Sequence, residues 1–196
     1  MTFKHQLSVG AAGESIVAAY FQSLGWTIQP VYEKFEQDHK GPRIFGQRRK
    51  YVAPDAMLIR YDGTGRPRAG YIEVKTKAYW TYHGKSGKFQ TGIDKHHCQE
   101  YEAVQRDTGI PVTLVFFHTS EQARFEDVKK WACPSIVDDG TGLFLGELSQ
   151  IARTDDIARG HASKGMAYWN KTDLRRVAAM DQLKRAALQF NVRWPY

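Results

Sequence analysis

Two carboxylates and one ammonium group stand at spacings that would bring them together on neighbouring strands. Glu73 and Lys75 lie two residues apart in a run, residues 69–76, whose alternation predicts a strand with both side chains on one face. Asp55 begins an earlier predicted strand, residues 55–61, and turn-forming residues fill the chain between the two. If the turn is centred near Thr64, Asp55 falls opposite Glu73. Like-charged carboxylates in contact repel, so the pair predicts a bridging cation or proton.

These groups suit metal-assisted hydrolysis of a phosphodiester. Oxygen ligands favour a hard divalent ion, Mg²⁺ with Mn²⁺ as a substitute, over zinc. An ion on Asp55, Glu73 and the Val74 carbonyl could polarise a phosphate and lower the pKa of a bound water. Lys75 would position or deprotonate that water and could stabilise charge on the pentacovalent phosphorus. The alternative is an ordinary surface ion pair between Glu73 and Lys75, which would contribute little.

The elements that must position these groups form a short α/β series. Apolar residues at helical spacing predict a helix over residues 8–24, ended by Gly25. A strand over residues 26–32 precedes the predicted hairpin. Asp94 is a suitable N-cap for a helix to about residue 107, and residues 112–117 read as a buried strand. The order helix, strand, strand, strand, helix, strand predicts an α/β fold with a mixed sheet covered by helices.

The motif residues and the order of the predicted elements resemble those of a known family. Pro54-Asp55, seventeen intervening residues and Glu73-Val74-Lys75 are similar to the motif of the PD-(D/E)XK nuclease superfamily, also called restriction-endonuclease-like. The α-β-β-β-α-β order over about residues 8–118 resembles the common core of that superfamily. The resemblance implies that Asp55 and Glu73 are metal ligands and that Lys75 is the catalytic lysine. The overall build resembles small nucleases of phages and other mobile elements, and this second resemblance is weaker.

The resemblance also suggests accessory residues. Glu14, in the first helix, resembles the extra acid that many members supply as a catalytic or metal-ligating group. Lys95 and Gln99, four residues apart on the second helix, are candidates for the polar residue which that helix often adds. Members that act processively from ends often carry Gln and Tyr four positions apart there. Here Tyr101 follows Gln99 by only two positions. The resemblance therefore does not imply a processive activity that starts from DNA ends.

Positive charge predicts a polyanionic partner. Lys and Arg total 28 against 21 Asp and Glu, which gives a formal charge of +7. Residues 34–50 hold six basic and two acidic side chains, and because bound phosphates release condensed counterions, such a cluster suits DNA. The same stretch is too long for a tight turn, which leaves an insertion, a loop or an extra hairpin. The candidate DNA-binding residues are Arg43, Arg48, Arg49, Lys50, Lys77, Trp80, Lys85 and Lys88. Trp80 could stack on unpaired or distorted bases, or could pack a loop over residues 79–88 onto the core.

Composition narrows the class of protein. The chain has 196 residues, 42% of them hydrophobic and 25% charged, as in a packed globular protein. We find no apolar run long enough for a membrane span and no readable signal peptide. Two cysteines do not make a disulfide framework, so a cytoplasmic location is the simplest expectation. We expect no membrane partner and no organic cofactor.

The rest of the chain predicts an extension of the core. Strands are expected over residues 143–148 and 166–169, followed by a long helix capped by Thr172 and carrying Leu174, Val177, Leu183 and Leu188. We therefore divide the chain into a nuclease core, residues 1–120, and an extension, residues 121–196, that packs on it within one structural domain.

The combined expectation is a Mg²⁺-dependent nuclease acting on DNA, with an endodeoxyribonuclease favoured. Two alternatives stay open. One is a nucleic-acid-binding or assembly protein with a vestigial site on the same fold. The other is a nuclease specific for RNA or for branched repair intermediates. A homodimer that makes paired cuts is also left open.

Overall fold

The computed structural model describes residues 3–31, 43–45, 49–156 and 165–194. The helices are α1 (Phe3–Ser23), α2 (Lys95–Thr108), α3 (Phe125–Trp131) and α4 (Met180–Gln189), with short 3₁₀ turns at Leu148–Gln150 and Lys171–Asp173. The strands are β1 (Thr27–Pro30), β2 (Arg43–Phe45), β3 (Lys50–Val52), β4 (Ala56–Tyr61), β5 (Pro67–Lys77), β6 (Thr81–His83), β7 (Lys88–Asp94), β8 (Val112–His118), β9 (Gly142–Glu147), β10 (Arg153–Asp156), β11 (Met166–Asn170) and β12 (Arg175–Ala178).

A six-stranded mixed sheet in the order β1-β4-β5-β8-β9-β12 forms the centre. Only the central pair, β5 and β8, is parallel, and α2 provides the crossover between them. A second sheet has the order β10-β11-β7-β6, and β2 pairs with β3 as a separate hairpin. The predicted α/β class, with its α-β-β-β-α-β order and a mixed sheet flanked by helices, is confirmed.

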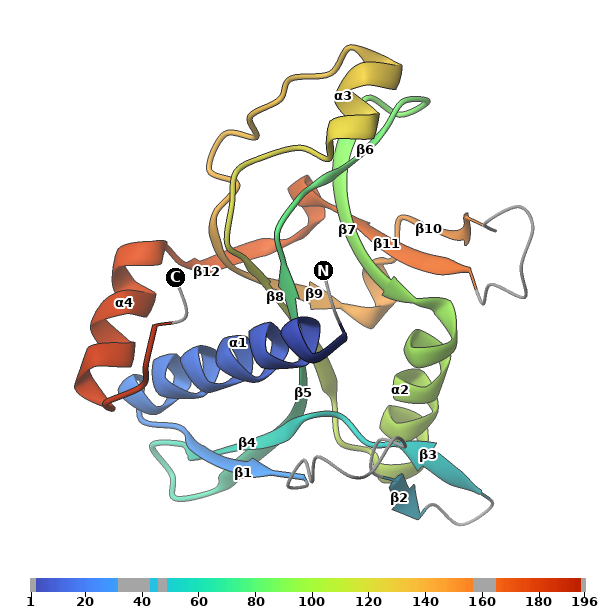
Figure 1. Cartoon of the computed structure of the whole chain (residues 1–196). Helices are drawn as coiled ribbons and strands as arrows, with labels where there is room; N and C mark the ends of the chain where they lie inside the picture. The colour runs from blue at the N-terminus through green and yellow to red at the C-terminus, as the bar shows by residue number, and fades with distance from the viewer. Residues whose placement is uncertain (1–2, 32–42, 46–48, 157–164, 195–196) are drawn as a thin grey trace.

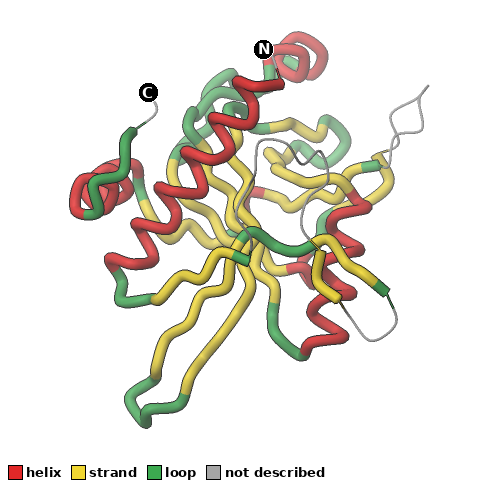
Figure 2. Tube along the Cα trace, turned by 60° about the horizontal axis from the view of Figure 1, so that its bottom comes forward, coloured by secondary structure: helices red, strands yellow, loops and turns green. Residues whose placement is uncertain are grey.

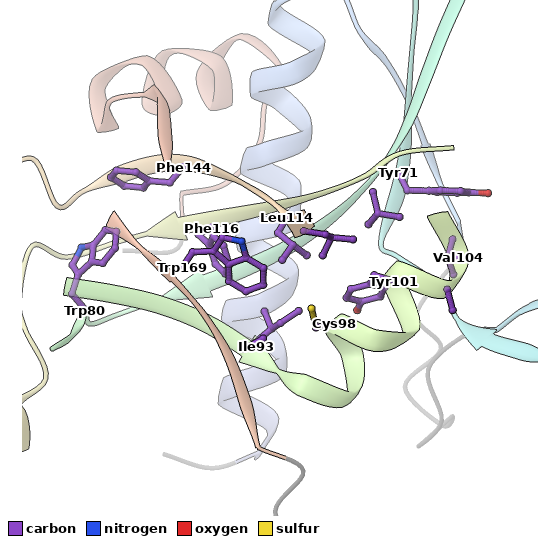
Figure 3. Packing of buried hydrophobic residues seen from close by; sticks show 14 of the residues in the cluster. Tyr71, Trp80, Ile93, Cys98, Tyr101, Val104, Leu114, Phe116, Phe144 and Trp169 are labelled. Atoms are coloured by element: carbon purple, nitrogen blue, oxygen red, sulfur yellow. The ribbon is translucent and has the colours of Figure 1, made fainter. Parts of the chain in front are cut away.

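Two apolar clusters cover the two faces of the central sheet. On one face, α1 and α4 lie side by side (Figure 1) and pack Val17 and Leu183 against Ile72 and Val115. On the other face, α2 and the second sheet pack over Leu114 and Phe116 (Figure 3). Because successive residues of a strand point to opposite faces, both faces of β5 and β8 are covered, and these strands are buried in the centre of the molecule.

The hairpin of β4 and β5 has the register that the sequence predicts. Ala56 pairs with Ile72 and Leu58 pairs with Gly70, the same offset that sets Asp55 opposite Glu73. Figure 2 shows this hairpin extending beyond the rest of the sheet. The first helix is also confirmed, although α1 begins five residues earlier than predicted. Gly25 follows it with a φ of 80°, a left-handed conformation that suits glycine.

The structure corrects the prediction for the last part of the chain. No helix begins at Thr172, which lies in a 3₁₀ turn; Leu174 ends that turn and Val177 belongs to β12. The reason is tertiary pairing: β12 is antiparallel to β9 and completes the edge of the central sheet, with Ala178 opposite Leu143. Helix α4 starts only at Met180. Apolar residues at helical spacing were therefore shared between a strand and a helix.

Two other segments differ from expectation. Residues 79–88, expected as a loop, include β6 and lead into β7, which form a hairpin of the second sheet. Asp94 occupies the N-cap position of α2 as predicted, but its side chain makes no capping hydrogen bond.

None of the described helices is long and apolar enough to cross a membrane.

Candidate active site

Asp55 lies at the start of β4 and is fixed by the neighbouring strand. Its Oδ2 accepts a hydrogen bond from the backbone N–H of Val74, with 2.8 Å between the two atoms. The preceding residues, Ala53 and Pro54, are buried, so the chain enters the strand along a defined path. Asp55 as a whole is partly exposed, so a ligand can approach this residue from solvent.

Glu73 is the most deeply buried acid of the site. Its residue is only 3% exposed, and its Oε1 accepts a hydrogen bond of 2.5 Å from Lys75 Nζ. Burial raises the pKa of Glu73 to about 7; the charge of Lys75 lowers this pKa and the charge of Asp55 raises it. The influence of Asp55 shows that the two acids, eighteen residues apart in the chain, share one electrostatic environment. The arrangement predicted from the hairpin register is thus present.

Lys75 contacts the buried Glu73 and is itself partly exposed to solvent. Its side chain is 32% exposed, whereas that of Glu73 is 4% exposed. Burial by itself lowers the pKa of Lys75, but the negative charges of Glu73, Asp55 and Glu14 outweigh it, and the net shift is upward. The side chain is therefore an ammonium ion at neutral pH. An ammonium held by a buried acid and partly exposed to solvent can bind an anionic oxygen.

Glu14 lies near enough to Lys75 to act on its charge, but it comes from the opposite face of the sheet. Gly13 makes this possible: a Cβ at that position would meet Thr76 Oγ1 at 1.9 Å. Helix α1 therefore crosses β5 at a glycine, and Glu14 follows directly. In the described residues no group of three or more His, Cys, Asp and Glu side chains is close enough together to hold a metal ion, so Glu14 is not placed beside the two acids as a third ligand.

The donor set nevertheless fits a magnesium ion. Mg²⁺ is commonly held by one or two carboxylates and keeps several waters or phosphate oxygens as its other ligands. Among the described residues, the buried Glu73 Oε2 has no hydrogen-bond partner, and the charge of Asp55 acts on the same carboxyl group. An orphaned buried acceptor is costly and requires an explanation. A cation shared by Asp55 and Glu73 would supply one.

Helix α2 contributes a different residue from those expected. Lys95 is half-buried and Gln99 is exposed, and the structure brings neither into a described contact with the two acids. Tyr101 is instead 1% exposed, and its hydroxyl lowers the pKa of Glu73. Figure 3 shows Tyr101 on the side of α2 that faces the sheet. In the sequence, Tyr101 has apolar spacing with Cys98 and Val104, and it follows Gln99 by two positions instead of four, so it is not among the candidates.

The candidate DNA-binding residues divide into three groups. Arg43, Lys50, Lys85 and Lys88 are exposed, as a phosphate contact requires. Arg49 is exposed too, but its Nη1 lies 3.1 Å from Oε1 of the buried Glu100, so part of its charge is neutralised within the chain. Arg48 lies outside the described residues.

Two of the candidates are not surface residues. Lys77 is half-buried, and burial and the charge of Lys75 lower its pKa to about 8. Trp80 is fully buried, stacks on His118 with 3.7 Å between ring centroids, and donates a hydrogen bond to Gly140 O. Its proposed stacking on bases is thus corrected: its apolar ring fills the core between the sheets, which is the second of the two alternatives for this residue.

The chain was compared with protein families, curated sequences and solved structures. No protein-family model and no curated protein sequence matches the chain. Among solved structures, a Holliday junction resolvase of the archaeon Archaeoglobus fulgidus is similar, with a TM-score of 0.47 and 10% sequence identity. The alignment covers 83% of this chain and 89% of that chain. We therefore infer the function from the residues of the candidate active site.

Proposed function

We propose that this protein is a divalent-metal-dependent nuclease that hydrolyses DNA phosphodiester bonds as an endodeoxyribonuclease. The observation that supports this best is the convergence of Asp55, Glu73 and Lys75: a buried acid, a partly exposed acid and an ammonium that bridges to solvent. A pair of acids whose charges repel is retained at the cost of stability, which is typical of functional sites.

In this proposal Asp55, Glu73 and the Val74 carbonyl hold Mg²⁺, which supplies polarisation of the phosphate and a more acidic water. The hydrogen bond from Val74 N–H fixes one Asp55 oxygen against β5 and so orients the carboxylate. Lys75 binds the anionic phosphate and stabilises the charge that develops on the pentacovalent phosphorus. Glu14 acts through Lys75, since its charge helps to keep the ammonium protonated.

In this proposal, exposed cations on two hairpins hold a DNA strand across the candidate site. Asp55 follows the β2–β3 hairpin by a few residues, and β5 leads from Lys75 toward the β6–β7 hairpin. Figure 1 shows these two hairpins at opposite ends of the molecule. Exposed Arg43 and Lys50 lie on the first, and exposed Lys85 and Lys88 lie on the second. DNA bound to both would pass the candidate site between them.

Nicking of supercoiled DNA tests the proposal. We expect cleavage with Mg²⁺ or Mn²⁺ and none with EDTA. Lys75→Ala should reduce the rate by at least about a hundredfold, because it removes the cation beside the phosphate, while DNA binding measured in EDTA changes little. Lys129→Ala, which removes an exposed lysine from α3, is the matched control and should cleave like the unaltered protein.

A protein with a vestigial site would bind DNA in the same assay but show no metal-dependent nicking before or after the Lys75 change. Equal cleavage by Lys75→Ala and Lys129→Ala would contradict the assignment of Lys75. RNA, single-stranded, linear and branched DNA in parallel reactions would identify the preferred nucleic acid.

A further inference from the structure

The β2–β3 hairpin has one buried and one exposed face. Ile44 pairs with Tyr51, and both pack against the apolar cluster beside α2. The neighbouring pair, Phe45 and Lys50, points the opposite way by strand alternation. Phe45 is 76% exposed, and the Lys50 ammonium lies 4.7 Å from the centre of its ring. Arg43, two residues before Phe45, shares this outer face and is exposed.

The exposure of Phe45 does not result from a loosely attached hairpin. The backbone N–H of Val52 donates to Oε2 of the buried Glu100 over 3.1 Å, and Arg49 forms an ion pair with Oε1 of the same side chain. The Tyr51 hydroxyl donates to Asp107 on α2. Figure 2 shows the short hairpin lying beside this helix. The outer face is therefore presented to solvent from a fixed position.

An exposed aromatic ring among cations has the chemistry of a stacking site for nucleic acid. A base stacks on an aromatic side chain whatever its sequence, while adjacent cations bind the phosphates. Inside a continuous duplex both faces of each base are already stacked. A ring such as that of Phe45 consequently favours strands in which at least one base is unpaired or unstacked.

The hairpin also lies within a short reach of the candidate site. Lys50 precedes Asp55 by five residues, and five extended residues span at most about 18 Å. Nucleotides along a stacked strand are about 3.4 Å apart. Phe45 pairs with Lys50 across the hairpin, about 5 Å further away, so the base on Phe45 would lie within about seven nucleotides of the cleaved bond.

We propose that Phe45, with Lys50 and Arg43, binds an unpaired base close to the scissile phosphate. The substrate class is then DNA with an unpaired base near the cut, such as a flap, a gap or a branch point, rather than continuous duplex. This inference rests on the proposed nuclease function and assigns its specificity to the hairpin.

Binding in EDTA tests the inference separately from catalysis. The probes are a fully paired duplex and a flapped duplex that carries 2-aminopurine at the first unpaired position. We expect the unaltered protein to prefer the flapped probe and to change the fluorescence of its 2-aminopurine. Phe45→Ala should lose about tenfold or more in affinity for the flapped probe, with little change for the duplex, and should lose the fluorescence change. Phe45→Trp should keep both.

Phe125→Ala is the matched control, because Phe125 is 74% exposed but lies on α3. It should bind both probes like the unaltered protein. Equal losses in Phe45→Ala and Phe125→Ala, or none in either, would overturn the inference. So would a concentration-dependent self-association, seen by sedimentation, that Phe45→Ala abolishes, since Phe45 would then contact a second copy of the chain. If the nuclease proposal fails instead, the flap preference persists although no metal-dependent cleavage occurs.

Discussion

At the scale of single residues, the burial of Glu73 is the feature with the clearest energetic consequence. Its pKa is raised to about 7 from an ordinary value of 4.5, chiefly because burial disfavours the charged form. In the folded protein without metal, Glu73 therefore binds a proton more tightly than in the unfolded chain. A raised pKa of this kind stabilises the fold below pH 4.5, and the stabilisation is lost as the pH rises through about 7.

Glu73→Gln should remove this pH dependence, because the amide stays neutral. In EDTA, the melting temperature of the variant minus that of the unaltered protein should increase between pH 4.5 and pH 8. The difference between a pKa of 4.5 and one of about 7 corresponds to about 3 kcal/mol, or on the order of 10 °C in the melting temperature. Thermal unfolding followed by circular dichroism at several pH values measures the difference, and a constant difference would argue against a buried, titrating Glu73. Adding Mn²⁺ at pH 8 should stabilise the unaltered protein more than the variant.

At the scale of elements, the crossing of α1 over β5 depends on the absence of a side chain at Gly13. Alanine at an ordinary helical position stabilises a helix by about 1 kcal/mol relative to glycine. At Gly13, however, the added Cβ would meet Thr76 Oγ1 at 1.9 Å and Thr76 Cβ at 3.2 Å. The helix would have to move away from the strand, and Glu14 would move with it.

We therefore expect Gly13→Ala to destabilise the protein by roughly 1–3 kcal/mol, as overpacking does, and to slow cleavage. Gly10→Ala is the control on the same helix, since its Cβ would meet nothing within 4 Å, and it should be neutral or stabilising. Urea unfolding compares the two variants. Equal stabilisation by both would show that α1 does not approach β5 so closely.

The elements near the candidate site follow closely from the sequence because local signals agree there. Alternation in residues 69–76 and the turn around Thr64 define the register that brings Asp55 to Glu73. The last part of the chain gives conflicting signals. Leu174, Val177 and Leu183 suit a helix by spacing, but the open edge of β9 recruits residues 175–178 as a strand. Tyr101 could not be identified as part of the site, because a tyrosine at apolar spacing on α2 reads as an ordinary core residue.

At the scale of the whole molecule, the positive charges are distributed over different faces. Arg43 and Lys50 lie on the hairpin that precedes Asp55, whereas Lys184 and Arg185 lie on α4, which packs with α1 on the other side of the central sheet. All four residues are exposed. Since each phosphate contact releases counterions, the contribution of a cation to DNA binding can be read from the salt dependence of the affinity.

Replacing Arg43 and Lys50 with Gln should lower the slope of log affinity against log salt concentration by about two, because about 0.9 is lost for each phosphate contact in B-DNA. The same replacements at Lys184 and Arg185 remove equal charge from α4 and should leave the slope unchanged. Fluorescence anisotropy over a series of salt concentrations provides the measurement. Equal changes in both double variants would indicate binding by net charge alone and would exclude the hairpin as a specific contact.

The pairing of α1 with α4 has a consequence for how the protein is made. The hydroxyl of Tyr20 on α1 donates to the carbonyl of Val177, more than 150 residues later, and the apolar side chains of the two helices share one cluster. Strand β9 must also pair with β8, and β12 with β9, before the cluster around Val115 and Phe117 is complete. A nascent chain therefore cannot close this side of its core until the ribosome has translated past α4. Long-range closure of this kind slows folding, so incomplete chains should be sensitive to proteases and depend on chaperones.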